Sequence, residues 1–159
     1  MLSIRTILVP TDFSERSGHA FRLACSLARD HGARVVVLYV QRPDVVCVAE
    51  YATYAPDPIR TPADVKEKLC ARQAIDPDVV VECRVAEGDP AAAIVHAAKE
   101  LDADLIVMGT HGRRGLARLL LGSVADAVCR KSPCPMLKLK PPFPVPAAES
   151  AAVKGPATV

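Results

Sequence analysis

Two short segments of the chain combine residue types and spacings suited to holding a polar ligand. The first is Pro10-Thr11-Asp12, which directly follows an apolar run. A carboxylate at the end of a buried strand can accept hydrogen bonds from a ribose hydroxyl or a base amine. Asp12 has an alternative role, because a carboxylate here also stabilises the start of the following helix, by about 0.5 to 2 kcal/mol. The sequence leaves both roles open.

The second segment is rich in glycine and reads Gly109-x-x-Gly112, nine residues, then Gly122-Ser123. Glycines let the backbone approach a bulky anion, and the N–H groups at a helix start favour phosphate oxygens. Ser123 adds a hydroxyl there and is also a suitable N-cap. Gly-x-x-Gly alone is common in turns, so the predicted phosphate site depends on the whole spacing, with an apolar run before it and a helix after it.

Charged side chains near the glycines allow two interpretations each. His111 either touches a phosphate or faces water. Arg113, Arg114 and Arg118 stand among leucines. They can clamp phosphate oxygens, but a basic face on a short amphipathic turn is the commoner arrangement.

Other familiar chemistries lack their motifs. The chain has no Gly-x-x-x-x-Gly-Lys-Ser/Thr loop, no Gly-x-Gly-x-x-Gly after its first apolar run and no Gly-x-Ser-x-Gly. Its four histidines are scattered, and its six cysteines form no Cys-x-x-Cys pair. We therefore expect no metal site, and reduced, mostly buried thiols, with a redox pair at Cys129 and Cys134 as the alternative.

Length and composition favour one compact domain. The chain has 159 residues, half of them apolar, and 20 Lys and Arg against 18 Asp and Glu. A formal charge of +2 is far from that of a general nucleic-acid binder. No apolar run approaches the roughly 18 residues needed to span a bilayer, and the N-terminal residues do not resemble a secretory signal. We expect a cytoplasmic protein that contacts neither nucleic acid nor membrane.

Alternating strand and helix patterns predict a doubly wound α/β fold with a parallel sheet. Strands are expected at 6–9, ending at Pro10, and at 35–40, 79–85, 105–108 and 136–139. Helices are expected from Ser14 to Gly32, from Thr61, from Gly88-Asp89-Pro90 to Leu101, and from Ser123 to Pro133. Residues 41–60 read as a long loop, and residues 141–159 as a disordered tail after a domain at 1–140. Ligands of such folds bind outside the carboxyl ends of the strands.

These segments resemble the universal stress protein family. The resemblance covers residues 3–140 and includes Pro10-Thr11-Asp12-Phe13-Ser14, the run Asp104 to Met108 before the glycines, the helix start at Gly88-Asp89-Pro90 and the full glycine spacing. It implies a Rossmann-like, five-stranded parallel sheet of order 3-2-1-4-5. That order would place the first and fourth strands side by side and bring Asp12 and Gly109 to one crevice.

The resemblance also implies a ligand and a site. Family members with this glycine spacing bind ATP, usually with a divalent metal such as Mg²⁺ on the phosphates. By position, Asp12 would hold the ribose or adenine, and the backbone of Val40 would meet the adenine edge. The ribose and phosphates would be cradled by Gly109, Gly112, Gly122, Ser123 and Val124, with Arg113 beside them and with Pro10, Thr11, Met108 and His111 as walls.

The function expected from this resemblance is that of a nucleotide-binding, stress-response regulatory protein, which changes conformation with nucleotide and binds a partner protein. Family members commonly form homodimers through the last strand, here Met136 to Leu139. One alternative is a slow ATPase or phosphotransferase with Ser123 or His111 near the γ-phosphate, although no carboxylate stands between Gly109 and Asp126 to act as a base. The other is a nucleotide-independent, chaperone-like interaction module.

Overall fold

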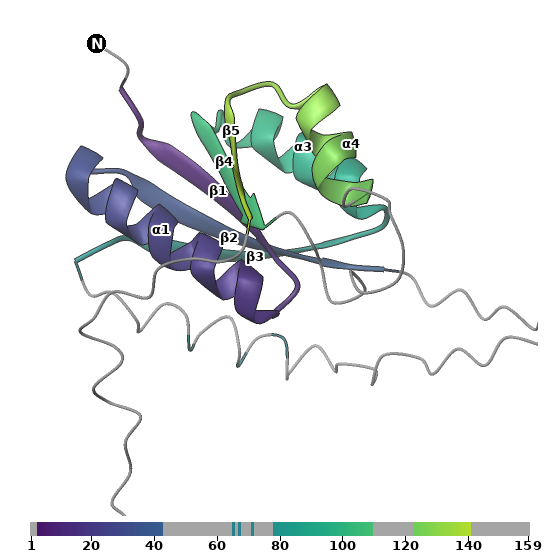
Figure 1. Cartoon of the computed structure of the whole chain (residues 1–159), viewed down its shortest axis with the longest axis horizontal. Coiled ribbons are helices and arrows are strands. Elements are labelled where there is room, and N and C mark those ends of the chain that lie inside the picture. Colours follow the sequence, from purple (N-terminus) through teal and green to yellow (C-terminus); the bar gives the residue numbers. More distant parts are fainter. Residues whose placement is uncertain are drawn as a thin grey trace, which may run out of the picture.

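The computed structural model describes residues 3–42, 65, 67, 71, 78–109 and 123–140. Strands and helices alternate along this part of the chain (Figure 1). The strands are β1 (Thr6–Thr11), β2 (Arg34–Gln41), β3 (Val81–Glu87), β4 (Leu105–Gly109) and β5 (Met136–Leu139). The helices are α1 (Glu15–His31), α3 (Pro90–Glu100) and α4 (Ser123–Lys131).

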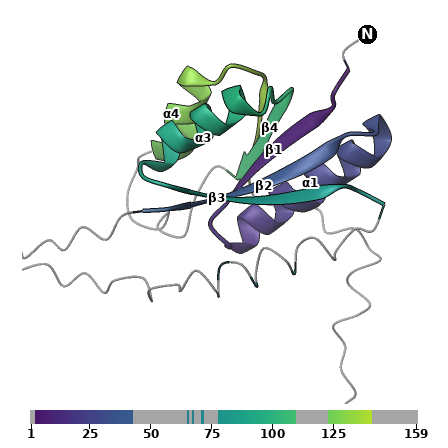
Figure 2. The ribbon, with the colours of Figure 1, turned by 180° about the vertical axis from the view of Figure 1, so that it is seen from behind.

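The five strands form one parallel sheet in the order β3-β2-β1-β4-β5, which confirms the predicted topology. Helix α1 covers one face, and α3 and α4 lie together on the other, as the two opposite views agree (Figures 1 and 2). The fold is therefore doubly wound. The order of the strands reverses at β1 and β4, where ligands of such folds bind.

Side chains of the central strands alternate between the two covered faces. Ile7 and Val9 pack in the cluster under α1, whereas Leu8 packs with Ile94 and Val128 under α3 and α4. Because both faces are covered, every position must be apolar. This explains why the central strands read as continuous apolar runs.

The ends expected for α1 and α3 and the C-terminal end expected for α4 are confirmed. The Ser14 side chain accepts a hydrogen bond from the Ser17 N–H, and Gly32 ends α1 in the left-handed conformation with φ 64°. Asp89 caps α3 in the same way through the Ala92 N–H, with Pro90 in the first turn. Helix α4 ends at Lys131, before Pro133.

Several strand boundaries differ from the predicted ones, and the differences are largest, at two residues, in β1 and β3. Strand β1 continues through Pro10 to Thr11, because its ladder with β2 covers all six residues while its pairing with β4 reaches only Leu8. Proline lacks an N–H and is tolerated where one side of a strand is unpaired. Strand β3 runs from Val81 rather than 79, since its first partner in β2 is Val35; Val80 is 66% exposed.

The cysteines also differ from expectation. Of the four thiols that the structure describes, only Cys25 is buried, whereas Cys129 is exposed and Cys83 and Cys134 are half-buried. None of the four forms a disulfide. Cys129 follows the buried Val128 in α4 and thus lies on the outer side of that helix, while Cys83 lies in the edge strand β3.

Several expectations fall largely or wholly outside the described residues. Of the predicted loop at 41–60, only residues 41 and 42 are described, and the tail at 141–159 lies beyond the described ranges. Of the helix expected from Thr61, residues 65, 67 and 71 are described; they are helical, and Val65 is buried in the cluster under α1. No described helix is long and apolar enough to cross a membrane.

Candidate functional site

The candidate site is the carboxyl edge of the sheet, where β1 and β4 separate. Their pairing is confined to Ile7 with Leu105 and Leu8 with Ile106, although both strands are described in full beyond these pairs. Beyond them, β1 stays paired with β2 up to Thr11, and β4 stays paired with β5 up to Gly109. Thr11 and Gly109 therefore end two neighbouring strands that diverge, as the predicted crevice requires.

Asp12 stands at the β1 side of this edge, and its carboxylate holds the backbone. Its Oδ1 accepts a hydrogen bond from the Ser14 N–H at 2.9 Å, and the residue is half-buried. Ser14, not Asp12, is the N-cap of α1. Asp12 thus supports the start of the helix indirectly, because it holds the backbone of Ser14, the residue that caps α1.

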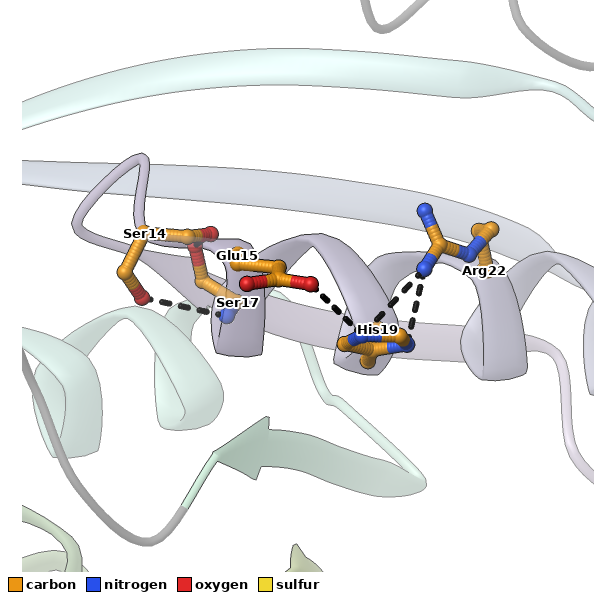
Figure 3. Close-up of polar contacts among 5 residues, drawn as sticks. All are labelled: Ser14, Glu15, Ser17, His19 and Arg22. Carbon is orange, nitrogen blue, oxygen red and sulfur yellow. Dashed lines mark hydrogen bonds and ion pairs between the residues drawn. The ribbon is translucent and has the colours of Figure 1, made fainter. Parts of the chain in front are cut away.

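A second group of hydrogen bonds lies beneath Asp12. The Thr11 hydroxyl accepts from the Phe13 N–H at 3.1 Å and lies 3.1 Å from the Ser17 hydroxyl. The Ser17 hydroxyl donates to the Ser14 carbonyl at 2.8 Å. Figure 3 shows the cap itself, in which the Ser17 N–H donates to Ser14 Oγ at 3.3 Å. Sequence reasoning did not anticipate Ser17, whose only signal is a hydroxyl one turn after a possible cap.

Phe13 has an unusual backbone for an aromatic residue. Its φ is 61°, in the left-handed region that L-residues avoid at a cost of about 1 to 2 kcal/mol. Its ring lies against Tyr39 at the end of β2, with the centroids 5.0 Å apart and the planes tilted by 34°. This conformation lies in the short turn between β1 and α1, directly after Asp12.

On the β4 side, Gly109 packs tightly against the first turn of α1. A Cβ at Gly109 would lie 3.3 Å from Arg16 Cβ and 3.6 Å from the Arg16 backbone carbon and oxygen. The sequence predicted that this glycine lets an anion approach. The structure supplies a second reason for it, which is the close contact between β4 and α1.

Helix α4 begins at Ser123, which follows β4 in the chain and so starts at the same carboxyl edge. Only the helical backbone of Ser123 is described. Val124 packs on the cluster under α3 and α4, as do Met108 and Val40. The remaining predicted residues, His111, Gly112, Arg113 and Gly122, lie outside the described residues, as do Arg114 and Arg118.

The outer side of α1 carries a chain of polar contacts around His19 (Figure 3). Arg22 donates to His19 Nδ1 at 2.7 Å, and Glu15 Oε1 lies 3.7 Å from His19 Nε2. Because a guanidinium can only donate, the His19 nitrogen that it contacts is the acceptor of this bond. These contacts run along the helix, through spacings of three and four residues.

The opposite end of the sheet, where the amino ends of β1 and β4 lie, has an open hollow lined by Arg5, Thr6 and residues 101–104. There the Asp104 carboxylate accepts from the Arg5 N–H at 2.8 Å and from the Thr6 N–H at 2.9 Å. These bonds lower the pKa of Asp104. Since they join the amino ends of β1 and β4, this carboxylate has a structural role. Within the described ranges, no three His, Cys, Asp or Glu residues gather as metal ligands.

The edge strand β5 carries the segment predicted to form a dimer. Leu137 is 39% exposed, while the Lys138 ammonium is 2.7 Å from the Asp126 carboxylate of α4. This contact raises the pKa of Lys138. The Lys138 side chain therefore already has an ion-pair partner within its own chain, Asp126 of α4.

Comparison with known proteins identifies the family. The model of the universal stress protein family matches residues 3–140. Universal stress protein MJ0531 of Methanocaldococcus jannaschii is 36% identical over 141 residues, which cover 87% of this chain and 83% of that protein. Universal stress protein YxiE of Bacillus subtilis is 35% identical over 142 residues, covering 82% and 95%.

Solved structures agree. UspA of Lactobacillus plantarum superposes with a TM-score of 0.71 at 28% identity, covering 86% of this chain and 98% of that one. A universal stress protein in complex with cAMP gives 0.63 at 28% identity, covering 87% and 98%. One from Archaeoglobus fulgidus in complex with dAMP gives 0.60 at 26% identity, covering 88% and 100%. The chain belongs to the universal stress protein family.

Proposed function

We propose that this protein binds an adenine nucleotide, ATP, in the crevice between the carboxyl ends of β1 and β4. The observation that carries the proposal is the divergence of the two strands after Leu8 and Ile106, with Asp12 at one rim and Gly109 at the other. A crevice at this place is where doubly wound folds receive nucleotides. The glycine spacing from Gly109 to Ser123 adds the elements of a phosphate site.

The relatives support the class of ligand. The two structures that hold cAMP and dAMP share an adenine, a sugar and a phosphate in their ligands. ATP is the nucleotide proposed for this chain, because its glycine spacing is the one associated with ATP in the family, and Mg²⁺ would then be held on the phosphates. Asp12 would accept from the ribose or the adenine amine, and the Val40 backbone would meet the adenine edge.

The biological role proposed is regulatory. Nucleotide occupancy would change the conformation of a cytoplasmic homodimer, joined through β5, and so govern the binding of a partner protein in the stress response. The exposed Leu137 on the edge strand favours such pairing, because an unpaired edge strand needs a partner or a cover.

The test is a calorimetric titration with Mg-ATP of the native protein and Asp12→Asn. Asparagine keeps an Oδ1 acceptor for the Ser14 N–H but replaces a carboxylate oxygen with a donor. We expect affinity to fall about tenfold to hundredfold, as for the loss of a hydrogen bond to a charged group. The matched control is Asp89→Asn, because the Asp89 carboxylate likewise accepts a backbone N–H near the start of a helix, but at the end of β3.

Each outcome of the titration has a clear meaning. Weaker binding in Asp12→Asn with native affinity in Asp89→Asn supports the crevice. An equal loss in both variants would indicate a general effect of charge at this edge and would count against Asp12 as a ligand contact. Absence of binding at millimolar Mg-ATP by the native protein would refute the proposed function.

A further inference from the structure

We propose that the hydroxyls of Thr11 and Ser17 are positioning groups, which hold the turn that presents Asp12 to the ligand; the inference rests on the proposed function. Both residues are buried, Thr11 to 7% exposure and Ser17 to 5%. Neither hydroxyl is needed for the N-cap of α1, which uses Ser14 Oγ and the Ser17 backbone N–H. Their bonds therefore need another explanation.

The direction of every bond in this group can be deduced. The Ser17 hydroxyl donates its single proton to the Ser14 carbonyl, which can only accept. In its contact with Thr11 it must therefore accept, so the Thr11 hydroxyl donates to it. Thr11 Oγ1 accepts in turn from the Phe13 N–H. The three hydrogen bonds thus all point the same way from donor to acceptor, starting at the Phe13 N–H, passing through the hydroxyls of Thr11 and Ser17 and ending at the Ser14 carbonyl.

This chain of hydrogen bonds involves the residues before and after Asp12. Its first link fixes the N–H of Phe13, the residue after Asp12, and its last link fixes the carbonyl of Ser14, whose own N–H donates to Asp12 Oδ1. Phe13 meanwhile has the unfavourable φ of 61°. A strained turn persists only when its surroundings over-determine it. The Thr11 hydroxyl is the group placed to do so, because it is the acceptor for the Phe13 N–H.

The chain offers a matched control on the same strand. Thr6 is 6% exposed and, like Thr11, its hydroxyl accepts a hydrogen bond, here from Arg34 Nε at 3.2 Å. It stands at the other end of β1, away from Asp12. The change of threonine to valine keeps the shape and removes the hydroxyl at either place. General effects of the substitution on β1 should therefore appear in both variants, whereas an effect on the Asp12 turn should appear only in Thr11→Val.

The first experiment uses the free protein and needs no ligand. We expect amide hydrogen exchange at Phe13 and Ser14 to be at least tenfold faster in Thr11→Val than in the native chain. It should be unchanged in Thr6→Val and restored in Thr11→Ser. Ser17→Ala should accelerate the same two amides and serves as a second variant if Thr11→Val folds poorly. Native exchange at both amides in Thr11→Val and Ser17→Ala would overturn the inference.

The second experiment is a double-mutant cycle on Mg-ATP affinity. Thr11→Val should weaken binding about tenfold in the native background and less than twofold in Asp12→Ala, since a positioning group acts through the residue it positions. A purely structural contribution would give the same fold-loss in both backgrounds, and would overturn the inference while leaving the proposed function intact. A native protein that binds no Mg-ATP would refute both, whatever the exchange rates show.

Discussion

Replacing Gly109 by alanine should destabilise the protein, although alanine is an ordinary residue for a strand. Gly109 lies in β4, opposite Leu139 of β5, and is not among the described residues with positive φ. An L-residue thus meets no backbone obstacle there. The obstacle is α1, because the added methyl carbon would lie 3.3 Å from Arg16 Cβ and 3.6 Å from the Arg16 carbonyl.

The magnitude follows from what must move. The atoms that the methyl would meet belong to the backbone and Cβ of a helix, so no flexible side chain can yield. The first turn of α1 must shift by a few tenths of an ångström, and such overpacking costs about 1 to 3 kcal/mol. For a domain of this size, that corresponds to a fall of roughly 2 to 12 °C in melting temperature.

The control is another change of glycine to alanine, for which we expect the opposite effect on stability. Gly18 lies inside α1, and a Cβ there would meet nothing within 4 Å. Gly18→Ala should therefore raise stability by up to about 1 kcal/mol, through helix propensity alone. Thermal and urea denaturation of both variants measure the difference. A Gly109→Ala protein that melts at or above the native temperature would refute the argument that α1 is packed against this glycine.

Two further predictions concern charged groups that hold strands and helices together. Asp104→Asn should lower the free energy of unfolding at pH 7 by about 1 kcal/mol, because one carboxylate oxygen accepts from two N–H groups and asparagine removes the charge that strengthens both bonds. Those bonds lower the pKa of Asp104 in the folded protein. The stability that the carboxylate contributes is therefore present above its pKa in the unfolded chain, about 3.9, and is lost as the pH falls through its lower pKa in the folded protein. Urea unfolding from pH 7 to 2 should show the stabilities of the two proteins converging in acid. Asp126→Asn should cost about 0.5 to 1 kcal/mol at neutral pH by removing the ion pair with Lys138. That pair raises the pKa of Lys138, so its contribution is present below the unfolded lysine value, about 10.4, and is lost as the pH rises through the folded value. A stability difference that does not shrink as the pH is raised through the alkaline range would contradict the assignment.

The sequence predicted most of the fold because its signals are local. Ser14, Gly32 and the Asp89-Pro90 pair define helix ends through groups within four residues of each other, and the apolar runs of β1, β2 and β4 are continuous because both sheet faces are covered. The errors occurred where a boundary depends on a neighbouring strand. Whether β1 passes Pro10 and where β3 begins are decided by pairing with β2, which no local pattern contains.

The same distinction applies to the candidate site. Topology alone brings Asp12 and Gly109 to one edge, and this was predictable once the strand order was known. The turn around Asp12 was not predictable, because the left-handed φ of Phe13 runs against the preference of an aromatic residue. It depends on the Thr11 hydroxyl, on Ser17 one turn into α1 and on Tyr39 of another strand.

Gly109 shows why a motif glycine needs a structural test before it is taken as a ligand contact. Its contact with Arg16 would by itself require a glycine at this position, whether or not a phosphate binds nearby. The two requirements predict different results for Gly109→Ala. If packing alone requires glycine, the variant should be less stable yet bind Mg-ATP normally when assayed well below its melting temperature. If the phosphate also needs the space, affinity should fall as well, and by more than in Asp104→Asn, a destabilised variant whose change lies at the amino ends of the strands.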